Sequence, residues 1–194
     1  MPKVEAASKD QREEAMSTLV LGFAADPVAR FFHADSARWL SAGRRFLDAF
    51  GGRAFDHGTA FVADDCRAVA LWLPPGVSPD EETMGAIIEE EIALRPAMAE
   101  AAAGLFEGMA KYHPHEPHWY LPLIAADPSR TGQGLGAALM KHVLARCDKE
   151  GVIAYLESSN PRNISLYERH GFRIMGEIRS AGAPVMTPML REPR

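Results

Sequence analysis

Residues 127–136 read Asp127-Pro128-Ser129-Arg130-Thr131-Gly132-Gln133-Gly134-Leu135-Gly136. This stretch joins an apolar segment to one in which Leu135, Leu139 and Val143 recur at helical spacing. Three glycines at alternating positions leave the backbone uncrowded, so several N–H groups can point into one concavity. The N-terminus of the following helix adds free N–H groups and the positive end of its dipole. The stretch therefore favours a site for a phosphate or pyrophosphate.

The glycine loop alone leaves a bare turn as an equal alternative. No Gly-Lys-Ser/Thr follows it, which excludes a P-loop, and no dinucleotide-binding unit surrounds it. A second informative segment lies further along the chain and reads Leu156-Glu157-Ser158-Ser159-Asn160-Pro161-Arg162-Asn163-Ile164-Ser165-Leu166-Tyr167-Glu168-Arg169-His170-Gly171-Phe172.

Together the two segments resemble the GNAT superfamily of N-acetyltransferases from about Trp119 to Ile178, with Met189-Leu190-Arg191 as the usual final strand. Two motifs in this order and at this separation are far more specific than either alone. The His-Trp-Tyr-Leu opening at 118–121 and the run from Leu156 to Asn163 look closest to the puromycin N-acetyltransferase-like branch. The first half of the chain matches the family only in broad organisation.

The order of elements predicts an α/β (α+β) fold, because paired strands come first and alternate with helices later. The resemblance implies the GNAT fold, a mixed and mostly antiparallel central sheet with helices on both faces. It also implies a single domain over residues 1–194, with acceptor-side elements in about 1–117 and the acetyl-CoA-binding core in about 118–194.

Local signals predict the individual elements. A first helix carries Met16, Leu19, Val20 and Phe23 and closes at Asp26-Pro27, and a second runs over 36–50 and ends at Gly51-Gly52. Strands over 59–63 and 68–73 form a hairpin, and Ser78 caps a helix that runs to Pro96 and resumes to about Lys111. The remaining elements are strands over 119–126, 152–156, 172–178 and 185–190 and helices over 134–150 and 163–169.

The resemblance also assigns residues to acetyl-CoA. The loop and the first turn of its helix should hold the pyrophosphate, through Arg130, Thr131, Gly132, Gln133, Gly134, Leu135, Gly136 and Ala137. Backbone groups of Leu123, Ile124 and Ala125 should pair with the pantetheine arm as an added strand would. Pro122 predicts a bulge there, because proline is unusual inside a sheet. Asn160 and Asn163 are expected beside the pantetheine, with helix capping as the alternative role.

One position departs from the family. Thr131 occupies a place that is usually Gln or Arg, so a side-chain contact to the phosphates is expected to be lost. Arg130, the neighbouring residue, could supply the charge instead or remain solvated.

The resemblance makes Tyr167 the general acid for the departing thiolate, since a phenol with a pKa of about 10 is protonated at neutral pH. The alternative is a tyrosine that only packs under the sheet. His118, Tyr120 and Glu157 are candidate general bases, and the sequence does not choose among them. The histidines around Pro114 have irregular spacing, which favours a substrate-side loop and no metal.

Composition narrows the partners. The net charge is −5 without a basic block, which disfavours nucleic acid, and no apolar run approaches a membrane span. Cys66 and Cys147 are expected to be buried thiols in a reducing compartment, and without a leader sequence the cytoplasm is the default location. A small-molecule or peptide amine is the expected partner, and a homodimer stays open.

The leading hypothesis is an enzyme that moves the acetyl group of acetyl-CoA, its co-substrate, onto a primary amine by direct attack in a ternary complex. The alternatives are a CoA-binding sensor that has lost turnover and a nucleotide-binding protein that uses the glycine loop.

Overall fold

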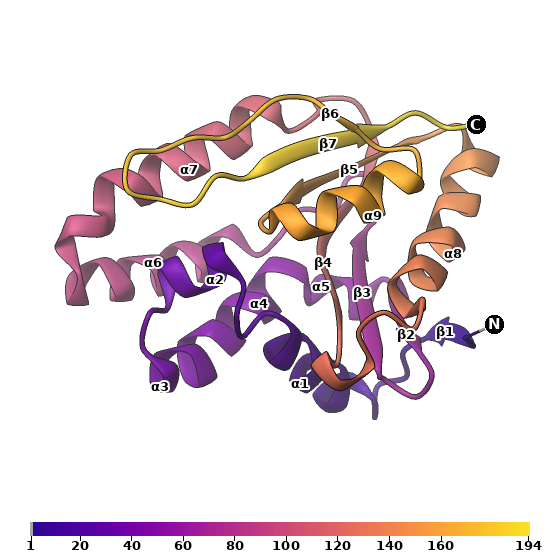
Figure 1. Ribbon diagram of the computed structural model, residues 1–194, viewed down its shortest axis with the longest axis horizontal. Helices are drawn as coiled ribbons and strands as arrows, with labels where there is room; N and C mark the ends of the chain where they lie inside the picture. The colour runs from indigo at the N-terminus through magenta and orange to yellow at the C-terminus, as the bar shows by residue number, and fades with distance from the viewer. Residues whose placement is uncertain (1) are drawn as a thin grey trace.

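The computed structural model describes residues 2–194, and its framework is one seven-stranded sheet in the order β1-β2-β3-β4-β5-β7-β6 (Figure 1). All neighbouring strands are antiparallel except β4 and β5, which are parallel. This confirms the predicted mixed, mostly antiparallel sheet. The strands are β1 (Val4–Ala6), β2 (Ala60–Ala63), β3 (Ala68–Leu73), β4 (His118–Ala126), β5 (Ile153–Ser158), β6 (Arg173–Ile174) and β7 (Thr187–Arg191).

Helices occupy most of the remaining chain. The α-helices are α1 (Arg12–Gly22), α2 (Pro27–Phe32), α3 (Ser36–Arg38), α4 (Arg44–Gly51), α5 (Arg53–Asp56), α6 (Glu81–Leu94), α7 (Ala99–Tyr112), α8 (Leu135–Glu150) and α9 (Ile164–Arg169). A π-helical turn, η1 (Trp39–Gly43), joins α3 to α4, and the 3₁₀ turns are η2 (Pro96–Met98), η3 (Pro128–Arg130) and η4 (Pro161–Asn163). Within the described residues, no helix is long and apolar enough to cross a membrane.

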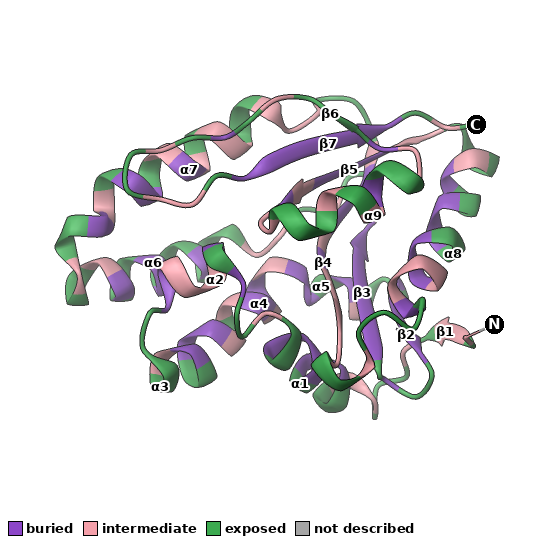
Figure 2. Cartoon of the chain, in the orientation of Figure 1, coloured by how far each residue is buried: buried purple, intermediate pink, exposed green. Residues whose placement is uncertain are grey.

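The sheet is covered on both faces, as its residue pattern shows. In β3, Ala68, Ala70 and Trp72 pack in one core cluster with α8, whereas Val69, Leu71 and Leu73 pack in a second cluster with α1. Every residue of β3 is buried (Figure 2), because successive strand residues face opposite sides and both sides carry helices. A third cluster lies away from the sheet, between α2, α6 and α7.

The two cysteines lie in these clusters and are buried, as predicted. Burial raises the pKa of the Cys66 thiol to about 11 and that of Cys147 to about 12. Both therefore stay thiols at neutral pH, which does not favour a nucleophilic role.

The predicted hairpin is present, and its turn carries left-handed backbone at Asp64, Asp65 and Cys66. The predicted end of the second helix is confirmed, because α4 ends at Gly51 and Gly52 is its C-cap. Gly52 does not use left-handed backbone, since its φ is −64°, and α5 begins at the next residue. A Cβ on Gly51 would lie 3.0 Å from side-chain atoms of Leu71 and Leu123, so this glycine allows α4 to approach the sheet closely.

The start of one helix and the end of another differ from the prediction. The third helix is capped by Asp80, whose side chain accepts a hydrogen bond from the Thr83 N–H, and not by Ser78. The pair Asp26-Pro27 lies beyond the end of α1 and begins α2, where Asp26 accepts hydrogen bonds from two backbone N–H groups. Aspartate is as good a cap as serine, so residue type alone did not identify the capping position.

Candidate active site

Strands β4 and β5 part within the sheet. They pair only at His118, Trp119 and Tyr120, and from Leu121 onward the described part of β4 pairs with β3 alone. On that side, Leu71 pairs with Leu123 but Leu73 pairs with Tyr120, so β4 carries one extra residue. This is the bulge that Pro122 predicted. It leaves the β5-facing edge of Leu123, Ile124 and Ala125 available to an added strand.

The glycine loop lies between β4 and α8. Gly132 (φ 81°) and Gly134 (φ 79°) adopt left-handed backbone, which other residues rarely do. Gly134 is also the N-cap of α8, and no side chain caps this helix. Gln133 is exposed on the loop, and Leu135, Gly136 and Ala137 form the first turn of α8, whose N–H groups have no partner within the helix. The loop thus fits the pyrophosphate of a CoA molecule.

The side chain of Thr131 forms a hydrogen bond within the loop, whereas the side chain of Arg130 forms no ion pair with the described residues. The Thr131 hydroxyl donates to the backbone oxygen of Pro128 at 3.2 Å. Arg130 is half-buried and forms no ion pair with any described residue. Its charge is therefore free to meet an anion.

The segment after β5 holds the predicted pantetheine contacts. Asn160 accepts a hydrogen bond from the Arg162 N–H at 3.1 Å, so its carbonyl caps η4 and the capping alternative holds for this residue. Asn163 is exposed, and its side chain makes no hydrogen bond within residues 2–194. Its amide is available to a ligand.

Tyr167 is buried on α9 with its ring edge-on to Phe172 at a centroid distance of 6.2 Å. Burial, and secondarily the negative charge of Asp26, raises the pKa of the Tyr167 hydroxyl. The hydroxyl therefore keeps its proton at neutral pH, as a general acid must.

Glu157, near the end of β5, is the acidic centre of the site. Its side chain is only 2% exposed. One carboxylate oxygen, Oε2, accepts a hydrogen bond from the Tyr120 hydroxyl at 2.8 Å. The other, Oε1, lies 3.9 Å from His113 Nδ1 and has no hydrogen bond of good geometry among the described residues. The Tyr155 hydroxyl also interacts with this carboxylate, and burial together with Glu157 raises the pKa of Tyr155. Burial raises the pKa of Tyr120, with Glu157 adding to the effect, so Tyr120 holds the carboxylate as a donor.

Two histidines continue from Glu157 toward the surface. The Nε2 atoms of His113 and His118 are 3.0 Å apart, and His118 Nδ1 lies 2.8 Å from the Glu116 backbone oxygen. Burial lowers the pKa of His118, so its ring is neutral at pH 7. His118 lines neither of the cavities described below, whereas His113 is 38% exposed and lines the larger one. Sequence reasoning did not assign His113 to proton transfer.

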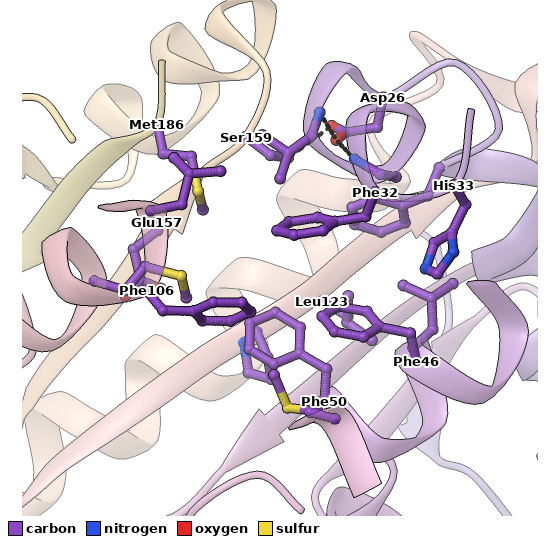
Figure 3. Close-up of a pocket in the computed structure, with 18 of the residues that line it drawn as sticks. Asp26, Phe32, His33, Phe46, Phe50, Phe106, Leu123, Glu157, Ser159 and Met186 are labelled. Atoms are coloured by element: carbon purple, nitrogen blue, oxygen red, sulfur yellow. Dashed lines mark hydrogen bonds between the residues drawn. The ribbon is translucent and has the colours of Figure 1, made fainter. Parts of the chain in front are cut away.

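A cavity of about 70 Å³ opens where β4 and β5 part (Figure 3). Pro122 and Leu123 line it from β4, Glu157 and Ser159 from β5 and the segment that follows, and most other lining side chains are apolar. A groove of about 710 Å³ adjoins it, because Phe50, Met84, Phe106 and Met109 line both.

The carboxylates that line the cavity and the groove are not balanced by a lysine or arginine among the described residues. Asp26 and Glu157 line the cavity, Glu81 and Glu89 line the groove, and no described lysine or arginine lines either. Such surroundings attract a cationic amine. In the part of the chain that the structure covers, no group of three or more His, Cys, Asp or Glu side chains could hold a metal ion.

Known proteins share both the sequence pattern and the fold. Residues 98–172 match the model of the acetyltransferase (GNAT) family. An uncharacterised N-acetyltransferase of Schizosaccharomyces pombe is 24% identical over 192 residues, covering 88% of this chain and 72% of the relative. A structure from Corynebacterium glutamicum, described as a histone acetyltransferase and related acetyltransferase, has a TM-score of 0.71 at 26% identity and covers 100% of this chain and 97% of its own.

The chain is thus similar in sequence and in fold to acetyltransferases of the GNAT type. Two further neighbours share the fold. A polyamine N-acetyltransferase of Drosophila melanogaster has a TM-score of 0.61 at 15% identity, covering 99% of this chain and 100% of its own. An agmatine N-acetyltransferase has a TM-score of 0.63 at 16% identity, covering 98% and 99%. The finer resemblance to the puromycin N-acetyltransferase-like branch stays a prediction.

Proposed function

We propose that the protein moves the acetyl group of acetyl-CoA onto a primary amine of a small molecule or peptide, by direct attack in a ternary complex. One observation carries the proposal. The free edge of β4, which suits the donor, and the cavity with the unpaired oxygen of Glu157, which suits the acceptor, meet at Leu123. Two neighbours named for acetylation of agmatine and polyamines support a small amine as the acceptor.

The chain offers the donor three kinds of contact. The N–H groups of the glycine loop and the first turn of α8, with Arg130 nearby, would bind the pyrophosphate. The edge of Leu123, Ile124 and Ala125 and the amides of Asn160 and Asn163 would hold the pantetheine arm. When bound, acetyl-CoA supplies the activated acyl group as a thioester.

Glu157 would prepare the acceptor. An alkylamine with a pKa near 10.4 is less than about 0.1% neutral at pH 7, so it must lose a proton before it can attack. The free Oε1 of Glu157 can accept that proton inside the cavity. His113, 3.9 Å away, and then His118 provide a route for the proton toward solvent. Tyr120 fixes the carboxylate through its other oxygen.

Tyr167 would complete the transfer. Its hydroxyl remains protonated because burial raises its pKa, so it can donate a proton to the thiolate that leaves. The ammonium form of the acceptor loses two protons in the reaction. One leaves through Glu157 before attack, and the second, released as the amide forms, replaces the proton that Tyr167 gives to the sulfur. One proton is therefore released per turnover.

Thermal unfolding with acetyl-CoA, ATP or NAD tests the donor. A ligand at one hundred times its dissociation constant adds about 2.7 kcal/mol to the free energy of unfolding. For a chain of this size the midpoint should rise by roughly 5–10 °C with acetyl-CoA. A rise with ATP or NAD alone would refute the proposal.

Replacement of Tyr167 by Phe tests the chemistry. The variant keeps the ring that packs on Phe172 but lacks the proton, so kcat for CoA thiol release should fall by about 10²-fold or more. Acetyl-CoA affinity, measured by calorimetry, should stay within about twofold of the wild type. Unchanged turnover would exclude Tyr167 as the acid.

A further inference from the structure

The cavity beyond Glu157 is narrow and apolar. Phe32, Phe46, Phe50 and Phe106 contribute aromatic rings to its wall, as Figure 3 shows. At about 70 Å³ it is smaller than the cavities of about 150 Å³ that admit benzene. It has room for a short unbranched chain, and the flexible side chains of Met84 and Met109 can adjust to one.

His33 lines this cavity on the side away from Glu157 (Figure 3). It is 1% exposed, and its Nε2 atom has no hydrogen-bond partner among the described residues. Buried polar atoms in native proteins nearly always have partners, so an unpartnered ring nitrogen beside a cavity points to a ligand.

The surroundings of His33 fix the ring through Nδ1 and leave Nε2 free of described partners. Its Nδ1 lies 3.3 Å from Glu91 Oε1, which already accepts a hydrogen bond from Arg38 Nε at 2.8 Å. Arg95 Nη2 lies 3.9 Å from the other oxygen of Glu91. Burial lowers the pKa of His33, so the ring is neutral. Its one N–H then points from Nδ1 to Glu91, and Nε2 is left as an acceptor for a ligand that can donate a hydrogen bond.

We infer that the acceptor is a short primary amine with an apolar chain and an uncharged polar tip, which reaches His33 while the amine lies at Glu157. This inference rests on the proposed function, because it names the acceptor of that same site. The class comprises amino alcohols and amines with a similar neutral tip.

Charged tips suit the site less well. A carboxylate at the His33 end would be removed from water into an apolar space that no described lysine or arginine lines. An ammonium group would meet a neutral ring there. Asp26 keeps its charge but not its free oxygens for a direct contact, since one caps α2 and the other accepts a hydrogen bond from the Ser159 hydroxyl at 2.6 Å.

A matched set of amines tests the inference on the wild-type enzyme. Alkylamines, amino alcohols, diamines and amino acids with terminal amines, each with chains of three to six carbons, are compared by kcat/KM for thiol release from saturating acetyl-CoA. At the best chain length, the amino alcohol should exceed both charged series at least tenfold and the alkylamine about threefold. A diamine or amino acid as the best substrate would refute the inference.

The outcomes separate the inference from the proposed function. Acetylation of a diamine or a peptide in preference to the amino alcohols would reject the acceptor class and leave the acetyl-CoA-dependent reaction standing. If acetyl-CoA neither binds nor releases thiol with any amine, both fail.

Replacement of His33 then tests the contact. His33→Leu fills similar space without hydrogen bonds, so the kcat/KM ratio of amino alcohol to alkylamine should fall at least fivefold, and His33→Asn should restore part of it. The ratio is read within one protein preparation, so a loss of folded enzyme cancels. An unchanged ratio in a folded His33→Leu variant would exclude His33 as the group that binds the tip.

Discussion

Glu157 combines three properties that a general base needs. It is buried, it is held through one oxygen by Tyr120, and its second oxygen is free at the acceptor cavity. Glu157→Gln keeps the shape but cannot accept a proton, so kcat/KM should fall by about 10²–10⁴-fold. Stopped-flow measurement of thiol release at saturating acetyl-CoA checks this.

Tyr120→Phe is the matched control, since it removes only the hydrogen bond to Oε2. Its loss should be smaller, about tenfold. Equal losses in both variants would indicate that Glu157 and Tyr120 act by holding the cavity in shape and not through proton transfer.

At the scale of elements, the link between the glycine loop and α8 depends on backbone conformation alone. Gly134 has φ 79°, and a Cβ added there would meet nothing within 4 Å. Gly134→Ala should therefore destabilise the fold by about 1–2 kcal/mol through strain, without a clash. It should also raise the dissociation constant of acetyl-CoA, because the loop N–H groups would turn away. Urea denaturation and calorimetry measure the two effects.

Two variants serve as controls for this prediction. Gly134→Asn should cost less, since asparagine tolerates left-handed backbone better than alanine does. Gly85→Ala lies within α6, also with no atom within 4 Å of the added Cβ, and should stabilise the fold by about 0.5–1 kcal/mol. A stabilised Gly134→Ala variant would contradict the argument.

Glycines illustrate which parts of the fold the sequence could predict and which it could not. The glycine loop before α8 was correctly placed between a strand and a helix, because the flanking segments have clear strand and helix patterns. Gly51 and Gly52 were correctly assigned to a helix end. The close approach of Gly51 to Leu71 and Leu123 could not be predicted, because those residues lie far away in the sequence. Strand β1 was missed, since only three residues pair with β2 and their side chains are partly exposed or exposed.

At the scale of the whole molecule, the two halves of the site differ in how they are encoded. The predicted donor contacts come from neighbouring segments, 123–137 and 160–167, so local patterns could identify them. The acceptor cavity unites α2, α4, α6, α7, β4 and β5. Its polar residues His33 and Asp26 have no sequence signal, because their importance arises only when distant helices pack together. Among the candidate bases, the structure brings Glu157 and Tyr120 together and adds His113, which no spacing rule had selected.

Packing of these helices also couples global stability to pH. Burial lowers the pKa of His33, as do the charges of Arg38 and Arg95, while Glu91 opposes the shift. As the pH falls, the unfolded chain binds a proton at His33 near pH 6.5, whereas the folded chain binds it only at a lower pH. The free energy of unfolding is therefore highest above pH 6.5 and falls as the pH drops toward the pKa of the folded state. His118, whose pKa is also lowered by burial, contributes with the same sign. The midpoint of thermal unfolding should decrease as the pH is lowered from 7.5 to 5.5. In the His33→Leu variant, the slope of the free energy of unfolding against pH should be smaller by the equivalent of up to one bound proton, whatever the stability of the variant at pH 7.5. A variant that keeps the full wild-type slope would show that His33 gains its proton equally well in the folded protein, and the ring would then be charged, not neutral, at the end of the cavity.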